Sequence, residues 1–461
     1  MREPLGADHL HGLLDVALGL DGADEVEARA EHGWGGLARF AGSAIHQHVA
    51  ADDTSVAVRV ISAGRIGVAS TNDATPAGVA AAGARALAAA RLSPPDPHYP
   101  GLAGPSVLPE GQRFDQATAA TSPRQRAEAV ATLLGALGPG QRAAGAVTTS
   151  AAEVAFATTA GARLHALSTR ASVSTVVTGL GGTGLGGTGL GVTGAAATGH
   201  GEDAARALGE LDVATVGQRA ASTAAAAVEP VDIAAGEHDV VLMPSAVATL
   251  VEYLGEAFSA KAVAEGRSPF SGRLGESFAS RLIDLADDPC HDRALGVPFD
   301  GEGTLRTRVQ LVDAGRAVAV IHDRASAAAG GTVSTGHGMP APNPWGPAPT
   351  HLVLAPGTST LDDLVAGIDR GLLVTRFWYT RSVNPKRTLV TGMTRDGTFR
   401  IEGGRRVGPV RNLRYNQSIL EALASCDGVG DRLRASSDEG GDIRVPALRL
   451  RSFRFTSTSD H

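Results

Sequence analysis

Two glutamates, Glu252 and Glu256, carry the first chemistry that the sequence suggests. They are four residues apart in a stretch whose apolar residues recur at helical spacing, so both carboxylates are expected on one face of a helix. Two carboxylates held close together push one pKa upward, which is how a general acid stays protonated. The pair could therefore act as a metal-free hydrolytic pair. An ordinary polar face of an amphipathic helix explains the same spacing more simply.

A short segment near residue 378 places three aromatic residues between two arginines, Arg376 and Arg381. The chain contains only 3 Trp and 4 Tyr among 461 residues, so this concentration is unusual. Arginine offers a carboxylate two parallel hydrogen bonds, and Arg376, Tyr379 and Arg381 are therefore candidates for binding a peptide carboxylate or lining a substrate tunnel. A structural explanation is equally open, in which Phe377 and Trp378 fill the core and the arginines bond to loop carbonyl oxygens.

Histidines offer a second kind of chemistry. His337 lies in a loop flanked by glycines and is a further candidate for contacting substrate. His46 and His48 alternate along an expected strand, so both point to the same face. A zinc site needs a third ligand, and none accompanies this pair. We therefore expect these two histidines at the surface or beside a substrate.

The glycine-rich stretch 179–193 repeats a pentapeptide and contains the spacing of a dinucleotide-binding fingerprint at Gly179, Gly181 and Gly184. The same spacing recurs in overlapping registers, so no glycine is specified for one particular turn. The next expected helix also begins well after the last glycine, which leaves no helix N-terminus for a pyrophosphate. We interpret the stretch as a Gly-rich loop or a strand edge that binds no nucleotide.

The bulk composition excludes several classes of protein. Apolar residues make up 43% of the chain and charged residues 19%, as in globular proteins, and 461 residues exceed one ordinary core, so two domains are expected. The formal charge is -7, without the basic face of a nucleic-acid binder. Signal-peptide and membrane-spanning patterns are missing, and Cys290 and Cys426 form no paired motif. We expect a cytoplasmic protein without nucleic-acid or membrane partners.

The elements that must position these residues fall into two predicted domains, 1–228 and 229–461. A strand is expected at 25–31, a hairpin over 54–69 that turns at Gly64, and several strands between 142 and 178. Helices are expected at 76–91, 123–136 and 202–220. The second domain begins with one marked helix over 245–264, which carries both glutamates, and continues mainly as strands. The predicted fold class is α+β, with an N-terminal α/β-type mixed domain followed by a β-rich C-terminal domain with one long helix.

Many short blocks, in order along nearly the whole chain, resemble the TldD/PmbA family, which also carries the label "modulator of DNA gyrase". The blocks are 39–47, 67–72, 262–268, 298–303, 334–338, 373–381, 389–399 and 408–418. The resemblance implies a metallopeptidase fold whose active members bind zinc. It also implies a choice, because the family contains a zinc-bearing kind and a partner kind that lacks the zinc ligands.

The zinc-bearing kind has a helix with two histidines and a glutamate directly after the first. When that motif is aligned on the predicted helix, Val251 and Glu256 occupy the histidine positions, and Glu252 keeps the glutamate. The third ligand of those members is a cysteine shortly before a Val-Pro strand. The corresponding segment 436–439 has no cysteine, and Cys426 lies too far upstream. The resemblance therefore implies that this chain binds no zinc and no other cofactor.

The resemblance implies a subunit like TldE or PmbA, which pairs with a zinc-bearing TldD-like homologue. In such a pair the partner supplies the zinc, and this chain helps to form the tunnel in which unfolded or short peptides are degraded or trimmed. The alternative is a homodimer that hydrolyses an amide of a small peptide-like metabolite without metal, using Glu252 and Glu256. A purely structural or binding role is the third hypothesis.

Overall fold

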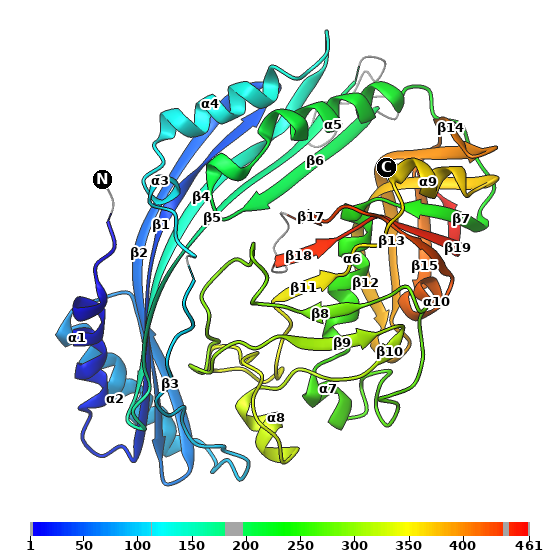
Figure 1. Cartoon of the computed structure of the whole chain (residues 1–461). Coiled ribbons are helices and arrows are strands. Elements are labelled where there is room, and N and C mark those ends of the chain that lie inside the picture. The colour runs from blue at the N-terminus through cyan, green and yellow to red at the C-terminus, as the bar shows by residue number, and fades with distance from the viewer. Residues whose placement is uncertain (1–2, 112, 180–196, 437–441, 460–461) are drawn as a thin grey trace.

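The computed structural model describes residues 3–111, 113–179, 197–436 and 442–459, and Figure 1 shows its two parts. The N-terminal part is built on an antiparallel six-stranded sheet. Its strands, in spatial order, are β3 (Arg65–Thr71), β2 (Ala44–Ser62), β1 (Glu25–Ala41), β4 (Arg142–Thr158), β5 (Arg163–Thr178) and β6 (Thr198–Ala205). Apart from Gly179, the glycine-rich stretch 179–193 lies outside the described residues.

Helices cover the outer face of this sheet (Figure 1). They are α1 (Ala7–Leu18), α2 (Pro76–Leu92), α3 (Gln116–Ala119), α4 (Pro123–Leu134) and α5 (Val213–Ala226), with the 3-10 turn η1 (Leu208–Glu210) before α5. Small residues allow this close packing, because a side chain at Gly67 would collide with the backbone of α2 and one at Gly199 with the backbone of α5. No helix of the described ranges is long and apolar enough to cross a membrane.

The C-terminal part consists of two sheets. In the first, β12 (Arg370–Asn384), β7 (Gly236–Leu242), β19 (Leu448–Thr458), β15 (Leu413–Ser418), β13 (Leu389–Glu402) and β14 (Arg405–Pro409) follow one another, and β16 (Cys426–Val429) pairs with β19. Because β12 also pairs with β13, five of these strands close into a barrel. The second sheet runs β10 (Arg316–Ala317), β9 (Val309–Asp313), β8 (Leu285–Asp287), β11 (His351–Leu354), β18 (Asp442–Val445) and β17 (Arg434–Ala435).

One buried helix, α6 (Pro244–Glu256), contacts strands of both C-terminal sheets. The remaining helices are short: α7 (Ala260–Ala264), α8 (Arg324–Ala329), α9 (Leu361–Ala366), α10 (Ile419–Ala424) and the turn η2 (Pro385–Arg387). The α+β prediction is confirmed, with a β-rich C-terminal part. The predicted division between residues 228 and 229 falls in the segment that joins α5 to β7.

Two predicted helices differ from the structure. The helix expected over 245–264 is broken, because the chain around Ser259 pairs with Ile321, whose N–H donates to the carbonyl oxygen of Phe258. The helix expected over 202–220 begins only at Val213. The first residues of that segment, 202–205, belong to β6, which pairs with β5 over its whole length. In both places a long-range pairing determines a structure that the local pattern does not reveal.

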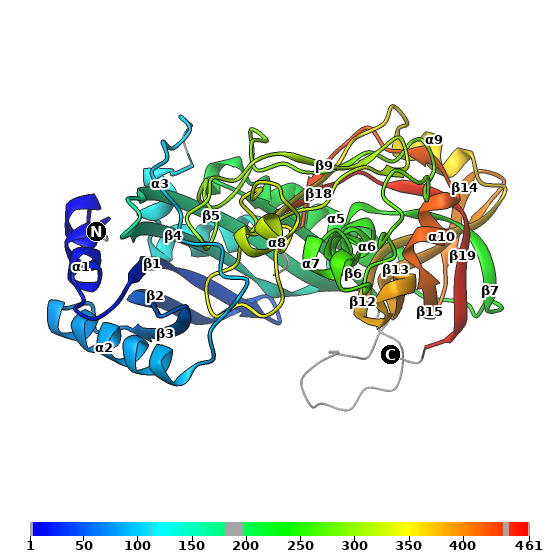
Figure 2. The same ribbon diagram turned by 90° about the horizontal axis from the view of Figure 1, so that it is seen from below.

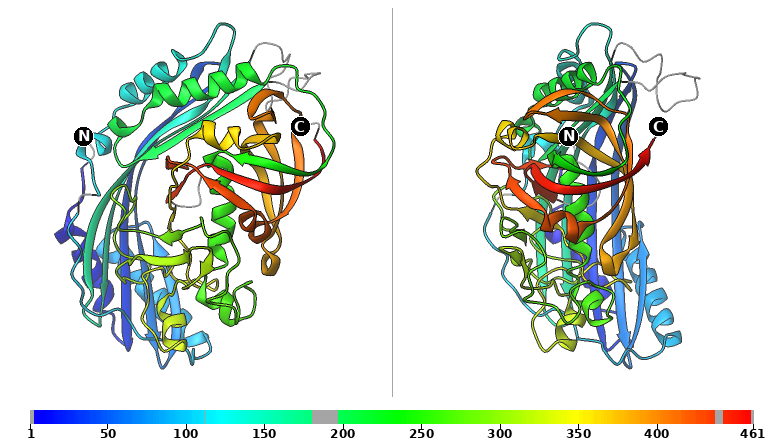
Figure 3. Two further views of the ribbon diagram at one scale, coloured as in Figure 1. Left: turned by 45° about the vertical axis from the view of Figure 1, so that its right-hand side comes forward. Right: turned by 90° about the vertical axis from the view of Figure 1, so that its right-hand side faces the viewer.

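The N-terminal sheet curves around the C-terminal part, as the views of Figure 3 show. Seen from below, α1 and α2 lie on the side of the sheet that faces away from the C-terminal part (Figure 2). Arg324 of α8 connects the two parts, since its side chain donates to the carbonyl oxygen of Leu102 at 2.7 Å. Within the C-terminal part, its backbone N–H donates to the Glu302 carboxylate at 2.8 Å. Burial, together with the charges of Asp300 and other carboxylates, raises the pKa of Glu302 to about 7.

The raised pKa of Glu302 predicts that stability falls as the pH rises. The Glu302 carboxyl has its ordinary pKa of 4.5 in the unfolded state and a pKa of about 7 in the folded state. Its contribution to stability is therefore fully present below pH 4.5 and is lost as the pH rises through 7. This rise in the pKa of Glu302 corresponds to at most about 3 kcal/mol of stability. We expect Glu302→Gln, which keeps an oxygen acceptor for Arg324, to be more stable than the wild type at pH 8.

Urea unfolding between pH 5 and 8 measures this effect. The exposed Glu128 provides the matched control, and Glu128→Gln should follow the wild-type curve. Parallel curves for Glu302→Gln and the wild type would show that Glu302 does not titrate near neutrality in the folded protein.

Candidate functional site

The helix α6 carries the expected catalytic pair. Its apolar residues are buried in the C-terminal core: Val247, Leu250, Val251 and Leu254. On the remaining surface of the helix, Glu252 is partly buried and Glu256 is exposed. Desolvation by the surrounding protein raises the pKa of Glu256, even though the residue as a whole is exposed. The charge of Glu252 is not among the causes of this shift.

Tyr253 links α6 to the arginine-rich segment of β12. Its hydroxyl donates a hydrogen bond of 2.7 Å to the carbonyl oxygen of Thr380, and Arg381 donates to the same oxygen at 3.0 Å. The Thr380 hydroxyl in turn lies 2.7 Å from the buried hydroxyl of Tyr415. The structure thus joins the Glu252 turn of the helix to two of the residues predicted to bind substrate, Arg381 and its neighbour Tyr379.

Tyr379 is presented to solvent by an irregularity in β12. The pairing of β12 with β13 shifts register between Trp378 and Arg381, and Tyr379 has a φ of 55°, a left-handed value that residues with side chains rarely adopt. Tyr379 as a whole residue is 65% exposed. The guanidinium carbon of Arg381 lies 4.5 Å from the centre of this ring, as in a cation–π pair.

Arg376 is held differently from Arg381. Its Nε lies 2.8 Å from Oδ2 of Asp396, and the two side chains are only 11% and 1% exposed. The guanidinium groups of Arg376 and Arg395 also lie 4.8 Å and 5.1 Å from the ring centre of Trp378. Arg376 is therefore fixed by a buried carboxylate and an aromatic ring, and its neighbour in the chain, Thr375, lines a pocket described below.

The structural explanation of this segment holds for some of its residues. Phe377 is buried in the core, and the centre of its ring lies 4.4 Å from the ring centre of Tyr415. Arg381 bonds to a backbone carbonyl, as that explanation expects. Trp378, however, is 43% exposed, and Arg376 pairs with a carboxylate instead of a carbonyl oxygen. The role of Arg376, Tyr379 and Arg381 in binding substrate stays a prediction.

His337 lies in another part of the molecule. It is 1% exposed, its Nδ1 lies 2.9 Å from the Thr335 hydroxyl, and its Nε2 lies 3.1 Å from Oδ1 of Asp287. The other carboxylate oxygen of Asp287 accepts backbone N–H groups of Thr350 and His351 at 2.7 Å and 3.1 Å. This network ties β8 to β11 in the second sheet. Burial gives no support to a contact between His337 and substrate, which stays a prediction.

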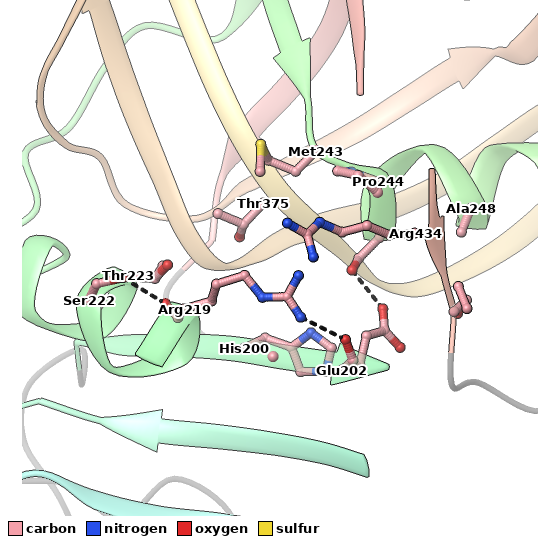
Figure 4. A pocket seen from close by; sticks show the side chains of 14 residues that line it. His200, Glu202, Arg219, Ser222, Thr223, Met243, Pro244, Ala248, Thr375 and Arg434 are labelled. Carbon is pink, nitrogen blue, oxygen red and sulfur yellow. Dashed lines mark hydrogen bonds between the residues drawn. The ribbon is translucent and has the colours of Figure 1, made fainter. Parts of the chain in front are cut away.

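A pocket of about 140 Å³ opens at the start of α6, where the two parts of the chain meet (Figure 4). The β6 residues His200 and Glu202 line it from the N-terminal part, together with Arg219 of α5. Ser245 and Ala248 of α6, Thr375 of β12 and Arg434 of β17 line it from the C-terminal part. Ser245 Oγ donates a hydrogen bond of 2.6 Å to Glu202. Because Glu252 follows Ala248 by four residues, it lies on the same side of α6 one turn further along.

The residues of this pocket are not predicted from the sequence. His200 and Glu202 alternate on a strand and share a face, which is a recognisable signal, but Glu202 begins the segment predicted as a helix over 202–220, and no strand is predicted around His200. Burial, followed by the charge of Arg376, lowers the pKa of His200 to about 4, so its ring is neutral at pH 7. His46 and His48 are exposed. Throughout the described ranges, no group of three or more His, Cys, Asp and Glu side chains is placed to hold a metal ion.

Two domain profiles of one family match this chain. The profile of the PmbA/TldA metallopeptidase C-terminal domain matches residues 235–457, and that of the PmbA/TldA metallopeptidase domain 1 matches residues 26–90. A metalloprotease of Methanothermobacter thermautotrophicus is 27% identical over 228 residues, which are 48% of this chain and 49% of that protein. A metalloprotease TldD homologue of Buchnera aphidicola is 27% identical over 197 residues, which are 42% and 40% of the two chains. The chain thus spans about half the length of the curated relatives it matches, or less.

Solved structures show the same fold. TldE from Thermococcus kodakarensis superposes on this chain with a TM-score of 0.85 at 23% sequence identity. The superposition covers 98% of this chain and 99% of the TldE chain. A protein of Thermotoga maritima described as a putative modulator of a DNA gyrase gives a TM-score of 0.84 at 18% sequence identity. This superposition covers 97% of this chain and 99% of the Thermotoga chain. With the two domain profiles and the order of the sequence blocks, this agreement shows that the chain belongs to the PmbA/TldD metallopeptidase family.

Proposed function

We propose that this chain is the zinc-free, TldE-like subunit of a peptidase assembly, in which a TldD-like homologue carries the zinc ion. The observation that carries this proposal is the burial of Val251, which is 1% exposed in the C-terminal core. This residue occupies the position of the first zinc-binding histidine in the resemblance described above. A valine has no donor atom for a metal, and its methyl groups are packed against apolar neighbours.

The other residues at the motif positions do not compensate for this loss. Glu252 and Glu256 offer carboxylates, but a protein zinc site is assembled from three or four ligands of suitable geometry. The third expected position falls in 436–439, whose sequence Ser-Ser-Asp-Glu contains neither Cys nor His. The residues present do not fit a zinc ion of the family kind, and we assign no catalytic step to such an ion on this chain.

In the proposed assembly this chain contributes structure to the substrate path. The network of Tyr253, Thr380 and Tyr415 fixes α6 against β12, which holds the exposed Tyr379 and Arg381 in place. These residues are suited to line a path for short or unfolded peptides, because arginine and tyrosine combine hydrogen-bonding groups with large contact surfaces. The zinc-bound water and the glutamate that activates it would belong to the homologue.

The rival function is a homodimer that hydrolyses an amide of a small peptide-like metabolite without metal. The observation that favours it is the raised pKa of Glu256, since a general acid must hold its proton at the working pH. In that case Glu252 and Glu256 would carry the reaction on this chain.

Glu252→Gln separates the two functions. We expect this variant to leave the peptidase activity of the assembled complex within about twofold of the wild type, because the proposed chemistry lies on the homologue. Loss of a general base or acid costs about 10²-fold or more, so the rival function predicts a loss of at least that size. Initial rates on an unstructured peptide measure the effect.

Glu256→Gln is the companion test, since it removes the second carboxylate of the pair to which the rival function assigns the reaction. A loss of about 10²-fold in either variant, with the complex still assembled, would contradict the proposal and support the metal-independent hydrolase.

A further inference from the structure

The pocket at the start of α6 is lined by two arginines that come from different parts of the chain. Arg219 extends from α5 and Arg434 from β17, and Figure 4 shows both guanidinium groups pointing into the pocket. Arg219 donates a hydrogen bond of 3.1 Å to the backbone carbonyl oxygen of Glu202. The guanidinium of Arg434 makes no hydrogen bond or ion pair with any residue that the structure describes. Arg434 is therefore available to a ligand.

The charges in this pocket do not cancel. Among the described residues that line the pocket, the two guanidinium groups face one carboxylate, that of Glu202, which accepts the hydroxyl of Ser245 at 2.6 Å. His200 adds no charge at pH 7, because its ring is neutral. The described lining of the pocket thus holds one more positive than negative charge, in a chain whose formal net charge is -7.

The backbone beside the arginines adds to this preference. The helix α6 begins at Pro244 without a side-chain cap, so its first turn presents the positive end of the helix dipole to the pocket. Asp203 is the further acidic group whose charge interacts with Arg434, and it lines the adjoining hollow instead of this pocket. These features all favour a small anion next to Arg434.

We propose that this pocket binds the carboxylate of a peptide substrate, with Arg434 and Arg219 as its ligands. The inference rests on the proposed function, because it takes the ligand to be a peptide. A volume of about 140 Å³ holds roughly five water molecules, which is room for a carboxylate and one small side chain. The planar guanidinium of Arg434 suits a carboxylate, since it offers two parallel N–H donors. The carboxylate is either the C-terminus of the peptide or an acidic side chain near its end.

Titration calorimetry on the full-length chain tests the assignment with three probes. They are acetyl-trialanine as the free acid, its C-terminal amide, and the same amide with aspartate as the last residue. We expect at least one of the two carboxylate probes to bind, and the one that binds identifies the source of the carboxylate. The neutral amide should bind at least about tenfold more weakly, since a charge-assisted hydrogen bond is lost.

Arg434→Gln should weaken the binding of the carboxylate probe by at least about tenfold. Arg432→Gln is the matched control, because Arg432 is exposed, lies two residues away and does not line this pocket. The Kd of this control variant for the carboxylate probe should lie within about twofold of the wild-type value. Thermal unfolding of both variants checks that they fold.

Three outcomes would overturn the assignment: equal binding of the acid and the amide, no binding of either carboxylate probe, or equal binding of the probe by Arg434→Gln and the wild type. None of these outcomes bears on whether the chain assembles with a homologue, so the two proposals can fail separately.

Discussion

Replacing Arg376 by alanine is expected to destabilise the protein by about 3–5 kcal/mol, because the change leaves a buried carboxylate without its counter-charge. Asp396 is 2% exposed, and both of its carboxylate oxygens lack a hydrogen-bond partner among the described residues. Arg376 compensates this charge at ion-pair distance, 2.8 Å, without the alignment of a hydrogen bond. Equilibrium unfolding in urea at pH 7 measures the loss.

Arg381→Ala is the matched control, since it removes an arginine of the same strand whose side chain is exposed. We expect it to cost less than about 1 kcal/mol, as surface interactions usually do. The double variant Arg376→Ala with Asp396→Ala should recover part of the stability, because no uncompensated charge remains. If Arg376→Ala costs no more than Arg381→Ala, the buried pair does not hold this segment, and Arg376 is free to serve substrate instead.

Asp287→Ala is expected to destabilise the protein by a similar amount, about 3–5 kcal/mol. The carboxylate is fully buried, accepts two backbone N–H groups and lies 3.1 Å from Nε2 of His337. Its removal leaves the two backbone N–H groups without their acceptor and takes away the carboxylate that faces the His337 ring. Asp313→Ala, on the exposed end of β9, should stay within about 0.5 kcal/mol of the wild type.

The pH dependence of the Asp287 effect provides a second readout. Burial alone would raise the pKa of Asp287, but the hydrogen bond and charge of His337, with the charge of His351, outweigh it and lower this pKa. The stabilisation is therefore present above the pKa of an unfolded aspartate and is lost as the pH falls through the lower folded value. The difference in unfolding free energy between the wild type and Asp287→Ala should shrink in acid. A difference that stays constant down to pH 3 would contradict an ionised Asp287 in the folded state.

The fold followed from the sequence where the signals are local. The helix predicted at 123–136 is observed as α4, which ends at Leu134 and starts with the capping box of Ser122 and Gln125. The hairpin at Gly64 is observed between β2 and β3. Closure of the barrel between β12 and β13 and the break in the helix at Ser259 depend on partners far away in the chain. No local pattern specifies such partners.

The site was predictable in the same uneven way. The helix, the position of Val251 within it and the arginine-rich strand could all be located from the sequence. That Arg376 pairs with Asp396 depends on the bulged pairing of two strands, and that His337 pairs with Asp287 depends on packing between separate segments. The pocket of His200, Glu202, Arg219 and Arg434 forms only where the two parts of the chain meet. Its residues are spread over more than 200 positions, so spacing could not reveal it.

Native mass spectrometry of the untagged protein, isolated gently from its own host, tests most directly whether the chain is the zinc-free member of a pair. We predict a complex of this chain with a second chain of similar mass, with zinc that stays with the second chain when the complex is dissociated. A metal-free homodimer that shows full peptidase or amidase activity would contradict the proposal, and so would zinc bound to this chain alone.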